Sequence, residues 1–505
     1  MKMNKIAVIL SVIFFVGMQH TTVNGQQVQS DKHRPLIHFT PKAHWMNDPN
    51  GMVYYKGVYH LFYQYYPGGT QWGPMHWAHA SSKDLMHWKH LPVALYPDTL
   101  GLIFSGSAVV DHMNTSGFGK GGKVPLVAIF THSSTDKEKQ KNQVSQYQSL
   151  AFSLDEGLTW EKYEGNPVLP NPGIADFRDP KVHWNDTVKK WVMTLATKDR
   201  ITFYSSPNLK DWTKESEFGE KLGAHGGVWE CPDLFPLKIN GMTKWVLLIS
   251  INPGAPNGGS GTQYFIGDFN GHVFIPTSTE TRWIDYGTDN YAGITWSNTG
   301  DRKVFIGWMN NWDYAGIVPT EAWRGATTLP RELKLVENKG LLALSSFPVK
   351  ELDKLKSKSI STKNIRIKGL IDLTKKPISN AFKLELSGKK LSSFELIFSN
   401  DLGEKLIVGY DAKNYRYFID RANSGEVSFN KNFSKVHYAP RTDNGGVLDM
   451  TLVIDVASIE MFAENGQTVM TDVFFPGKPF NKVSMKADVS FNIERVKFTE
   501  LKSSL

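Results

Sequence analysis

Ser82-Lys83-Asp84-Leu85-Met86-His87-Trp88 and Ser206-Pro207-Asn208-Leu209-Lys210-Asp211-Trp212 share one Ser…Leu…Trp frame, and residues 153–160 form a looser copy with one extra residue. The tryptophans that end these copies, together with Trp283, recur at intervals of 52 to 72 residues. A unit of that size holds one four-stranded propeller blade with its loops, and radial repetition protects the sheet edges of an all-β chain. A sandwich also accommodates scattered Ser…Trp turns, so the repeat favours a propeller without excluding a sandwich.

Short apolar runs, rather than helical patterns, recur along the rest of the chain. Residues 51–55, 59–63 and 191–195 are such runs, bounded by Gly, Asn, Asp and Pro as β-strands are. Aromatic residues make up 12% of the sequence, and their flat rings suit β-sheet cores and also stack on sugars. At 505 residues the chain is too long for one ordinary core. We therefore predict an all-β protein of two domains.

The amino-acid composition changes after Pro330-Arg331-Glu332-Leu333, where tryptophans become fewer and lysines more frequent. Residues 381–386 and 393–398 then alternate with period two, as half-buried strands do. Asn465-Gly466 supplies a strong hairpin signal between two further apolar runs. These patterns predict a first domain over 26–340, a linker over 341–358 and a second β-domain over 359–505.

The N-terminus has the order of a cleaved secretory signal: Lys2 and Lys5, an apolar run over 6–16, and Val23-Asn24-Gly25. The run is too short to span a bilayer, so residues 1–25 predict export without membrane insertion, to the periplasm or the extracellular medium. Cys231 is the only cysteine, which excludes an intramolecular disulfide. The net charge is +8, but the lysines and arginines do not form a clustered basic stripe. Nucleic acid is therefore not an expected partner.

Three short acidic motifs carry the chemical information. They are Trp45-Met46-Asn47-Asp48-Pro49-Asn50-Gly51, Phe177-Arg178-Asp179-Pro180 and Trp229-Glu230-Cys231-Pro232. Each places a carboxylate next to or near a proline, and we expect them on loops held by a rigid scaffold. One Asp-Pro pair alone is usually only a turn. Together, in this order, the three motifs resemble those of glycoside hydrolase family 32, which contains invertases, inulinases and levanases that cleave β-fructofuranosides.

The resemblance covers nearly the whole chain and implies a fold: a five-bladed β-propeller catalytic domain followed by a C-terminal β-sandwich. It also implies that Asp48 is the nucleophile and Glu230 the general acid/base of a retaining hydrolase, with their carboxyl groups about 5 to 5.5 Å apart. By the same match, Asp179 binds sugar hydroxyls and stabilises the transition state, and Arg178 pairs with these carboxylates. The alternative interpretation of Arg178-Asp179-Pro180 is a salt-bridged turn that has no catalytic role.

Further positions match the family's binding site for the terminal fructose. The side-chain amides of Asn47 and Gln64 can donate hydrogen bonds to sugar hydroxyls and accept them. Trp72, Phe104 and Ser105 would form one wall of the binding site, and Trp312 would border it. Single aromatic residues of this kind serve equally well as core. Cys231 has no Cys-His signature, and the pairs His76/His79 and His87/His90 lack the companion ligands of a zinc site. Because two carboxylates suffice for glycoside cleavage, we expect no metal and no cofactor.

The resemblance thus predicts an exported, monomeric exo-acting hydrolase that releases terminal fructosyl units from levan or inulin and from sucrose. An endo-acting fructanase or a fructosyltransferase would carry the same three acids, because acceptor choice and chain access depend on pocket shape. A catalytically silent carbohydrate-binding protein is a third alternative, disfavoured by the retained acids. A cytoplasmic sucrose-phosphate hydrolase is disfavoured by the signal segment. The sequence leaves the choice between β-2,6 and β-2,1 linkages open.

Overall fold

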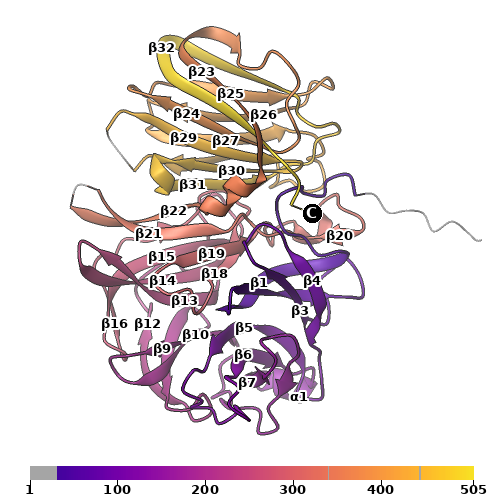
Figure 1. Ribbon diagram of the computed structural model, residues 1–505, viewed down its shortest axis with the longest axis vertical. Helices are drawn as coiled ribbons and strands as arrows, with labels where there is room; N and C mark the ends of the chain where they lie inside the picture. Colours follow the sequence, from indigo (N-terminus) through magenta and orange to yellow (C-terminus); the bar gives the residue numbers. More distant parts are fainter. Residues whose placement is uncertain (1–30, 339, 443–444, 505) are drawn as a thin grey trace, which may run out of the picture.

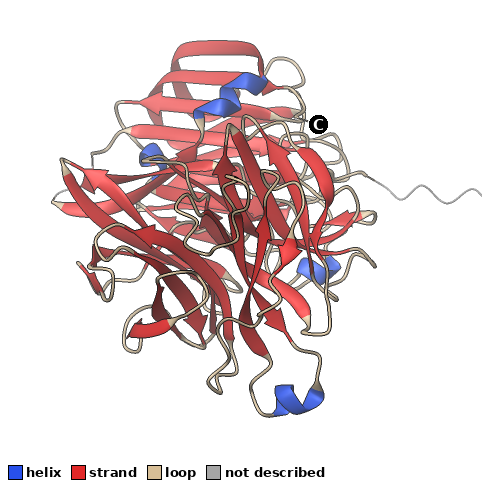
Figure 2. Ribbon diagram, turned by 60° about the horizontal axis from the view of Figure 1, so that its bottom comes forward, coloured by secondary structure: helices blue, strands red, loops and turns tan. Residues whose placement is uncertain are grey.

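The computed structural model describes residues 31–338, 340–442 and 445–504. The predicted signal segment, residues 1–25, lies outside the described residues. Two bodies of β-sheet lie one against the other, a propeller and a sandwich of orange and yellow strands above it in Figure 1. Apart from the short helix α1 (Lys137–Lys141) and three 3-10 turns, the described regular elements are strands, as Figure 2 shows. The all-β prediction is confirmed.

Five sheets form the propeller, and in each the first strand of the sequence is an inner strand that contacts its counterparts in the neighbouring sheets. The strands of the successive blades are β1 (His44–Tyr55), β2 (Val58–Tyr66), β3 (His76–Ser82) and β4 (Lys89–Leu95); β5 (Leu102–Val110), β6 (Leu126–Ser133), β7 (Gln146–Ser153) and β8 (Glu161–Lys162); β9 (Phe177–Asn185), β10 (Lys190–Thr197), β11 (Arg200–Ser206) and β12 (Thr213–Phe218); β13 (Val228–Ile239), β14 (Met242–Asn252), β15 (Gly261–Phe269), β16 (Phe274–Pro276) and β17 (Arg282–Trp283); β18 (Tyr291–Thr295), β19 (Lys303–Trp308), β21 (Arg331–Asn338) and β22 (Leu341–Pro348). The prediction of five blades is confirmed.

The Ser…Trp repeat marks the same place in three blades, the turn between the third and fourth strands. Its tryptophan closes the turn: the indole Nε1 of Trp88 donates to the carbonyl of Leu85 at 3.0 Å, and that of Trp212 to the carbonyl of Leu209 at 2.9 Å. Both leucines have positive φ angles, 66° and 67°. The frame is therefore a structural repeat in which each copy ends one blade.

The ring of blades is closed by a late segment of the domain. Strand β20 (Trp323–Arg324) returns to pair in parallel with the start of β1, and Val53 of β1 bridges to Ser297 beyond β18. The first blade thus gains a strand from the last part of the propeller. This closure brings β1 and β18 side by side, so residues about 240 positions apart share one end of the propeller.

The C-terminal domain is one continuous, folded-over sheet whose two halves enclose a common apolar core. The 20-residue strand β32 pairs with β25 through its first part and with β24 through its last part, so it runs from one layer into the other. The predicted Asn465-Gly466 turn joins β30 to β31. The strands are β23 (Lys356–Asp372), β24 (Phe382–Gly388), β25 (Phe394–Ser399), β26 (Lys405–Asp411), β27 (Arg416–Asn423), β28 (Val436–Pro440), β29 (Leu448–Asp455), β30 (Ser458–Ala463), β31 (Thr468–Val473) and β32 (Lys482–Leu501).

The boundary between the domains lies later than the sequence predicts. Residues 341–348, expected in the linker, form β22, which pairs along its whole length with β21 in the fifth blade. The connection is the 3-10 turn η2 (Lys350–Leu355), and the sandwich begins at Lys356. The fall in tryptophan content misplaces the boundary because the last strand of this blade has no tryptophan, whereas the lysine-rich stretch begins only after it.

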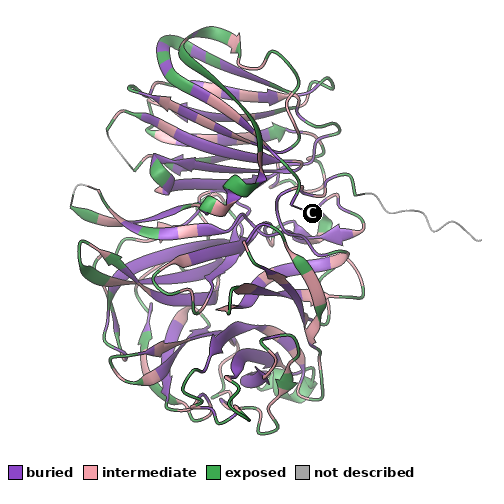
Figure 3. Ribbon diagram, viewed as in Figure 1, coloured by how far each residue is buried: buried purple, intermediate pink, exposed green. Residues whose placement is uncertain are grey.

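Buried residues are concentrated on the strands of both domains and along the surface between them (Figure 3). One apolar cluster joins the two, combining Leu329 and Leu352 with Phe462, Val469 and Leu501. The sandwich is thus packed onto the propeller through a shared core. Within the described ranges, no helix has the length and apolar character needed to cross a membrane.

Candidate active site

Each inner strand departs from regular pairing near one end of the propeller. In β1, Met46 pairs with Tyr65 and Pro49 with Tyr63, so Asn47 and Asp48 together face Gln64. Equivalent irregularities lie in β5, β9, β13 and β18, at residues 104–105, 179–180, 231–232 and 292–293. A β-bulge re-aims a side chain and bends its strand. The bulges therefore turn side chains from all five blades toward one another.

The prediction that the acidic motifs lie on loops is wrong, because all three lie inside strands β1, β9 and β13. Beyond the short pairing of β1 with β20 at His44 and Trp45, the inner strands have an edge without a ladder partner, where a proline without an N–H costs no ladder hydrogen bond. Pro49, Pro180 and Pro232 occupy this edge at or beside the bulges. Each Pro-containing motif thus marks a bulge in an edge strand.

Asp48 is held by three short side chains. The amide of Asn47 donates to its Oδ1 at 3.0 Å, and the hydroxyl of Ser105 donates to its Oδ2 at 2.7 Å. The thiol of Cys231 lies 3.5 Å from the same Oδ2. Burial and the nearby charge of Glu230 raise the pKa of Asp48, while these hydrogen bonds oppose the rise. The carboxyl group is therefore fixed in direction and lies close to a second acid.

Glu230 is fixed from both sides of its carboxyl group. Arg178 donates to Oε1 through Nε at 3.2 Å and through Nη2 at 3.0 Å. The hydroxyl of Tyr291, from β18, donates to Oε2. Arg178 is itself oriented by Asp176, at 2.5 Å, and the surrounding carboxylates raise the pKa of the guanidinium against the effect of burial. The side chain of Glu230 keeps 20% of its surface exposed, so solvent reaches it.

Asp179 is the third acid of the site and is close enough to the other two for their charges to act on it. Its φ of 64° places it in the left-handed region at the bulge of β9, and its backbone N–H donates to Thr131 Oγ1 at 3.1 Å. Its Oδ2 accepts the backbone N–H of Cys231 at 3.0 Å. Burial raises the pKa of Asp179 to about 7; Arg178 opposes this, and Glu230 and Asp48 add to it. Two acids with raised pKa values in one site are typical of an active site.

Cys231 is a buried neighbour of the acids. Its Sγ lies 3.5 Å from Asp48 Oδ2 and 3.6 Å from Asp179 Oδ2, so one thiol faces two carboxylates. Burial and these anions raise the pKa of the thiol well above its ordinary value. Since the reactive form of cysteine is the thiolate, this thiol is a donor and packing group and no nucleophile.

The two predicted amides lie beside Asp48. Asn47 Oδ1 accepts the indole N–H of Trp45 at 2.7 Å, which fixes the amide orientation. Gln64 faces the bulge from β2 and is 2% exposed, and its Nε2 has no hydrogen-bond partner within the described residues. A buried donor without a partner is uncommon in a folded protein. Gln64 therefore offers an unused donor next to the acids.

Two groups of aromatic side chains adjoin the residues that bond Asp48. Trp72, on the loop between β2 and β3, is 46% exposed and meets Phe104 edge to face with ring centroids 6.2 Å apart. Trp312 stacks on Trp45 at 5.9 Å and lies 4.9 Å from Trp308. The exposure of Trp72 distinguishes it from core aromatics, whereas Trp45 and Trp308 are fully buried. The structure thus brings every predicted site residue to one end of the propeller.

Three residues of this site carry no sequence signal of their own. Tyr291 is bonded to Glu230, Trp45 orients Asn47, and Asp176 orients Arg178. Trp45 and Asp176 lie within three residues of a predicted acid or arginine, so their motifs include or adjoin them. Tyr291 is 61 positions from Glu230, and only the pairing of blades four and five brings the two together. The packing of blade five against blade four, which a single sequence does not display, determines this contact.

The histidine pairs have structural partners. His79 hydrogen-bonds His60 at 3.0 Å between ring nitrogens, His76 donates to the carbonyl of Pro74, and His87 bonds Asp84 in its turn. Across residues 31–338, 340–442 and 445–504, no three His, Cys, Asp or Glu side chains gather as a metal site.

Asp179→Asn is expected to flatten the pH dependence of stability between about pH 4 and pH 7. The folded protein keeps a proton on Asp179 that the unfolded chain has already released in this window, because the folded-state pKa is raised. The wild-type free energy of unfolding therefore falls as pH rises, by up to roughly 1.4 kcal/mol per pH unit for one proton. Urea unfolding of both proteins at several pH values measures this. A stability difference that stays constant across the window would contradict the assignment.

Two family domains match the chain in sequence. The Glycosyl hydrolases family 32 N-terminal domain matches residues 38–345, and the Glycosyl hydrolases family 32 C terminal domain matches residues 350–501. The junction between the matches, residues 346–349, lies directly before η2, which connects the propeller to the sandwich. Together they cover nearly all of the described chain.

Named relatives have the same arrangement. The chain is 49% identical over 462 residues to a levanase of Bacillus subtilis, covering 89% of this chain and 67% of that protein. It is 39% identical over 505 residues to an extracellular exo-inulinase of Aspergillus awamori, covering 92% and 93%. The crystal structure of exo-inulinase from A. awamori superposes with a TM-score of 0.88 at 38% identity, over 94% of this chain and 100% of that one. Fructofuranosidase from Schwanniomyces occidentalis, complexed with fructose, superposes with a TM-score of 0.86 at 34% identity, over 94% and 100%. The chain therefore belongs to glycoside hydrolase family 32.

Proposed function

We propose that this protein is an exported β-fructofuranosidase that hydrolyses fructans from their fructosyl ends with retention of configuration. The observation that carries the proposal is the convergence of Asp48, Asp179 and Glu230 from three blades around one buried cysteine. Each carboxyl group has its own fixed partners. A retaining glycosidase needs two carboxyl groups with different roles, since one must attack while another supplies a proton.

In the first step, a carboxylate oxygen of Asp48 attacks the anomeric carbon C2 while Glu230 gives its proton to the departing glycosidic oxygen. The C2–oxygen bond breaks and an ester of Asp48 forms. The donors from Asn47 and Ser105 hold the nucleophile toward the sugar. The fixed position of Glu230 between Arg178 and Tyr291 keeps its proton near the leaving group.

In the second step, Glu230 takes a proton from water, whose oxygen attacks C2 and releases Asp48 with free fructose. Both steps pass through an oxocarbenium-like state with positive charge on the sugar ring. Asp179 faces this charge and accepts hydrogen bonds from the hydroxyls of the ring. Its own position is fixed by the N–H of Cys231 and by the bulge of β9. Preorganised groups of this kind stabilise a transition state without rearranging.

The terminal fructose is bound by the amides and aromatic side chains around the acids. The unused Nε2 donor of Gln64 is directed to a sugar hydroxyl, which would satisfy a buried group that has no other partner in the described chain. Trp72 supplies an exposed flat surface in contact with Phe104, and Trp312, stacked on Trp45, borders the site. The similarity to relatives named extracellular exo-inulinases supports both export and cleavage at chain ends.

Chromatography of the products from levan, inulin and sucrose tests the proposal. Fructose should be the first and only small product from at least one polymer, and the preferred polymer identifies the linkage. The reaction is sampled below 5% conversion, roughly, so that secondary hydrolysis of oligosaccharides stays negligible. An early ladder of oligosaccharides would contradict the exo mode and indicate an endo-acting enzyme.

The same samples separate the remaining functions. At high sucrose, a fructosyltransferase would give oligosaccharides longer than the substrate and little free fructose, because a sugar hydroxyl replaces water in the second step. A silent binding protein would retain the polymers without releasing any product. Either result would overturn hydrolysis as the function.

A further inference from the structure

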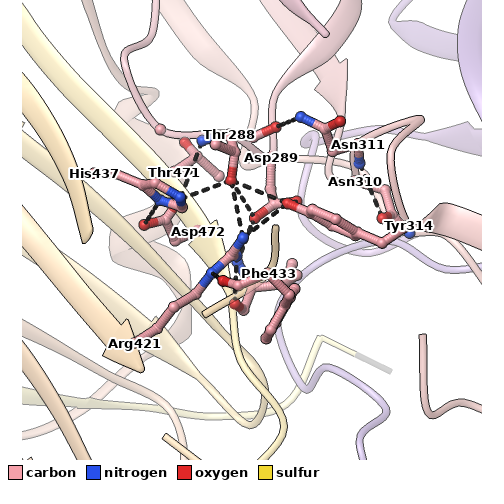
Figure 4. A network of polar contacts seen from close by, with 12 residues as sticks. Thr288, Asp289, Asn310, Asn311, Tyr314, Arg421, Phe433, His437, Thr471 and Asp472 are labelled. Atoms are coloured by element: carbon pink, nitrogen blue, oxygen red, sulfur yellow. Dashed lines mark hydrogen bonds and ion pairs between the residues drawn. The ribbon is translucent and has the colours of Figure 1, made fainter. Parts of the chain in front are cut away.

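A fully buried arginine of the sandwich domain faces the propeller. Arg421, on β27, has no exposed surface, and all five of its N–H groups donate (Figure 4). Such complete use of a planar guanidinium fixes the relative positions of its acceptors. The acceptors are Asp289 Oδ2 at 2.7 Å, Val473 O at 2.9 Å, Tyr314 OH at 2.9 Å, Thr288 Oγ1 at 3.2 Å and Phe433 O at 2.7 Å.

Three of these acceptors belong to two segments of the propeller that are also bonded to each other. The hydroxyl of Tyr314 donates to Asp289 Oδ1 at 2.6 Å, and the amide of Asn311 donates to the carbonyl of Thr288 at 2.8 Å. Figure 4 shows the segment around Thr288 and Asp289 lying against the turn from Asn310 to Tyr314, with Arg421 reaching both. We call these the 285–289 segment and the 310–314 turn.

The 285–289 segment follows β31 of the sandwich closely. Backbone N–H groups of Tyr286 and Asp289 donate to the carbonyls of Val469 and Thr471, at 2.8 and 3.0 Å. A Cβ on Gly287 would lie 2.1 Å from the carbonyl oxygen of Thr471, so only glycine permits this approach. The segment is therefore held by the sandwich along its length.

Both segments continue directly into the active site. Asp289 is two positions before Tyr291, whose hydroxyl is bonded to Glu230. The 310–314 turn carries Trp312, which stacks on Trp45. Trp45 in turn orients Asn47, which donates to Asp48. Two sets of contacts, each including a step of two positions along the backbone, thus lead from Arg421 to the two carboxyl groups proposed to perform the reaction.

We propose that Arg421 is a positioning residue of the active site, through which the sandwich domain fixes the places of Tyr291 and Trp312. The inference rests on the proposed fructofuranosidase function. It assigns the sandwich a part in catalysis that differs from general support: the domain supplies the guanidinium that joins the 285–289 segment to the 310–314 turn. Displacements of about 1 Å at a catalytic group are enough to cost on the order of 100-fold in rate.

Arg421→Lys is the principal test, because lysine keeps a positive charge opposite Asp289 but lacks the planar fork that reaches both segments. We expect kcat/KM on the preferred fructan to fall by roughly 10- to 100-fold at a temperature well below unfolding. The pH profile of kcat should also change, because Tyr291 donates to Glu230. A purely structural role would leave that profile unchanged.

Arg441→Lys is the matched control. Arg441 is also a nearly buried arginine of the sandwich, but its partners Glu464 and Tyr410 belong to the sandwich itself. Its replacement should lower the unfolding temperature while leaving kcat, KM and the pH profile within twofold of wild type. If Arg421→Lys also leaves these quantities within twofold, the proposal is overturned.

Tyr314→Phe keeps the test decisive should Arg421→Lys fail to fold. It removes one hydroxyl that bonds both Arg421 and Asp289 and changes no charge at neutral pH. We expect a smaller loss of kcat/KM, about 3- to 10-fold; wild-type kinetics and a wild-type pH profile would overturn the proposal.

Hydrogen exchange separates this inference from the proposed function, because it needs no substrate. Amides of the 285–289 segment and of the 310–314 turn should exchange faster in Arg421→Lys and at the wild-type rate in Arg441→Lys. Faster exchange in a protein without fructanase activity would leave the positioning role intact and refute only the function. Unchanged exchange in active protein would refute the positioning role.

Discussion

Asp48→Asn is expected to reduce kcat on fructan and sucrose by roughly 10⁴- to 10⁶-fold, the range seen when a catalytic nucleophile is removed. The amide cannot form the ester, and it no longer places negative charge beside the developing cation. Substrate affinity should change little, because the proposed sugar contacts of Gln64, Trp72 and Asp179 remain. Initial rates of fructose release, with equilibrium binding of sucrose measured separately, test both parts.

The stability of Asp48→Asn distinguishes lost chemistry from lost structure. Burial and Glu230 raise the pKa of Asp48, so its charged form is unfavourable in the folded site. Asparagine keeps an oxygen for the Ser105 donor and removes that charge. The variant should therefore unfold at the same temperature as wild type or higher at neutral pH. Activity within tenfold of wild type, in this variant and in Asp48→Ala, would exclude Asp48 as the nucleophile.

Glu230→Gln should lower kcat on natural fructans by about 10²- to 10⁴-fold, because no acid protonates the leaving oxygen. The loss in the first step should be much smaller with an aryl fructoside, whose phenolate departs without a proton. The second step still lacks its base, so the fructosyl-enzyme should accumulate after one rapid turnover. Rapid-mixing absorbance measurements of the phenolate would show this as a burst.

Azide provides a second result for the same variant, since it attacks C2 without needing a general base. Its addition should restore turnover of the aryl fructoside and yield fructosyl azide. Glu217→Gln is the control: it removes a surface carboxylate paired with Lys214 and Arg200 and should leave all rates unchanged. Equal losses of Glu230→Gln on fructan and aryl fructoside would refute its role as general acid.

The three acidic motifs indicate one common site because residues next to the acids bond other acids of that site. Asn47 and Cys231, adjacent to Asp48 and Glu230, are the residues that bond Asp48 and Asp179. The placement of the motifs on loops fails because a proline after an acid also marks a bulge in an edge strand. Sequence spacing alone does not distinguish a turn from such a bulge.

The Ser…Trp repeat predicts the end of a blade only where the turn between the third and fourth strands is long enough to contain it. In blades four and five, the fourth strand begins after a gap of four and two residues, so the Ser…Trp turn does not fit. The contacts of Tyr291 with Glu230 and of Arg421 with Asp289 join residues 61 and 132 positions apart. They depend on the packing of neighbouring blades and on the packing of the two domains, neither of which any local pattern encodes.

Peptide mass spectrometry of Glu230→Gln, quenched in acid after incubation with an aryl fructofuranoside, tests the central claim most directly. The account predicts one fructosyl unit attached through an ester to the peptide that contains Asp48, and none in the Asp48→Asn/Glu230→Gln double variant. A fructosyl ester on Asp179, or complete absence of an adduct during a burst of phenolate release, would contradict a double displacement at Asp48.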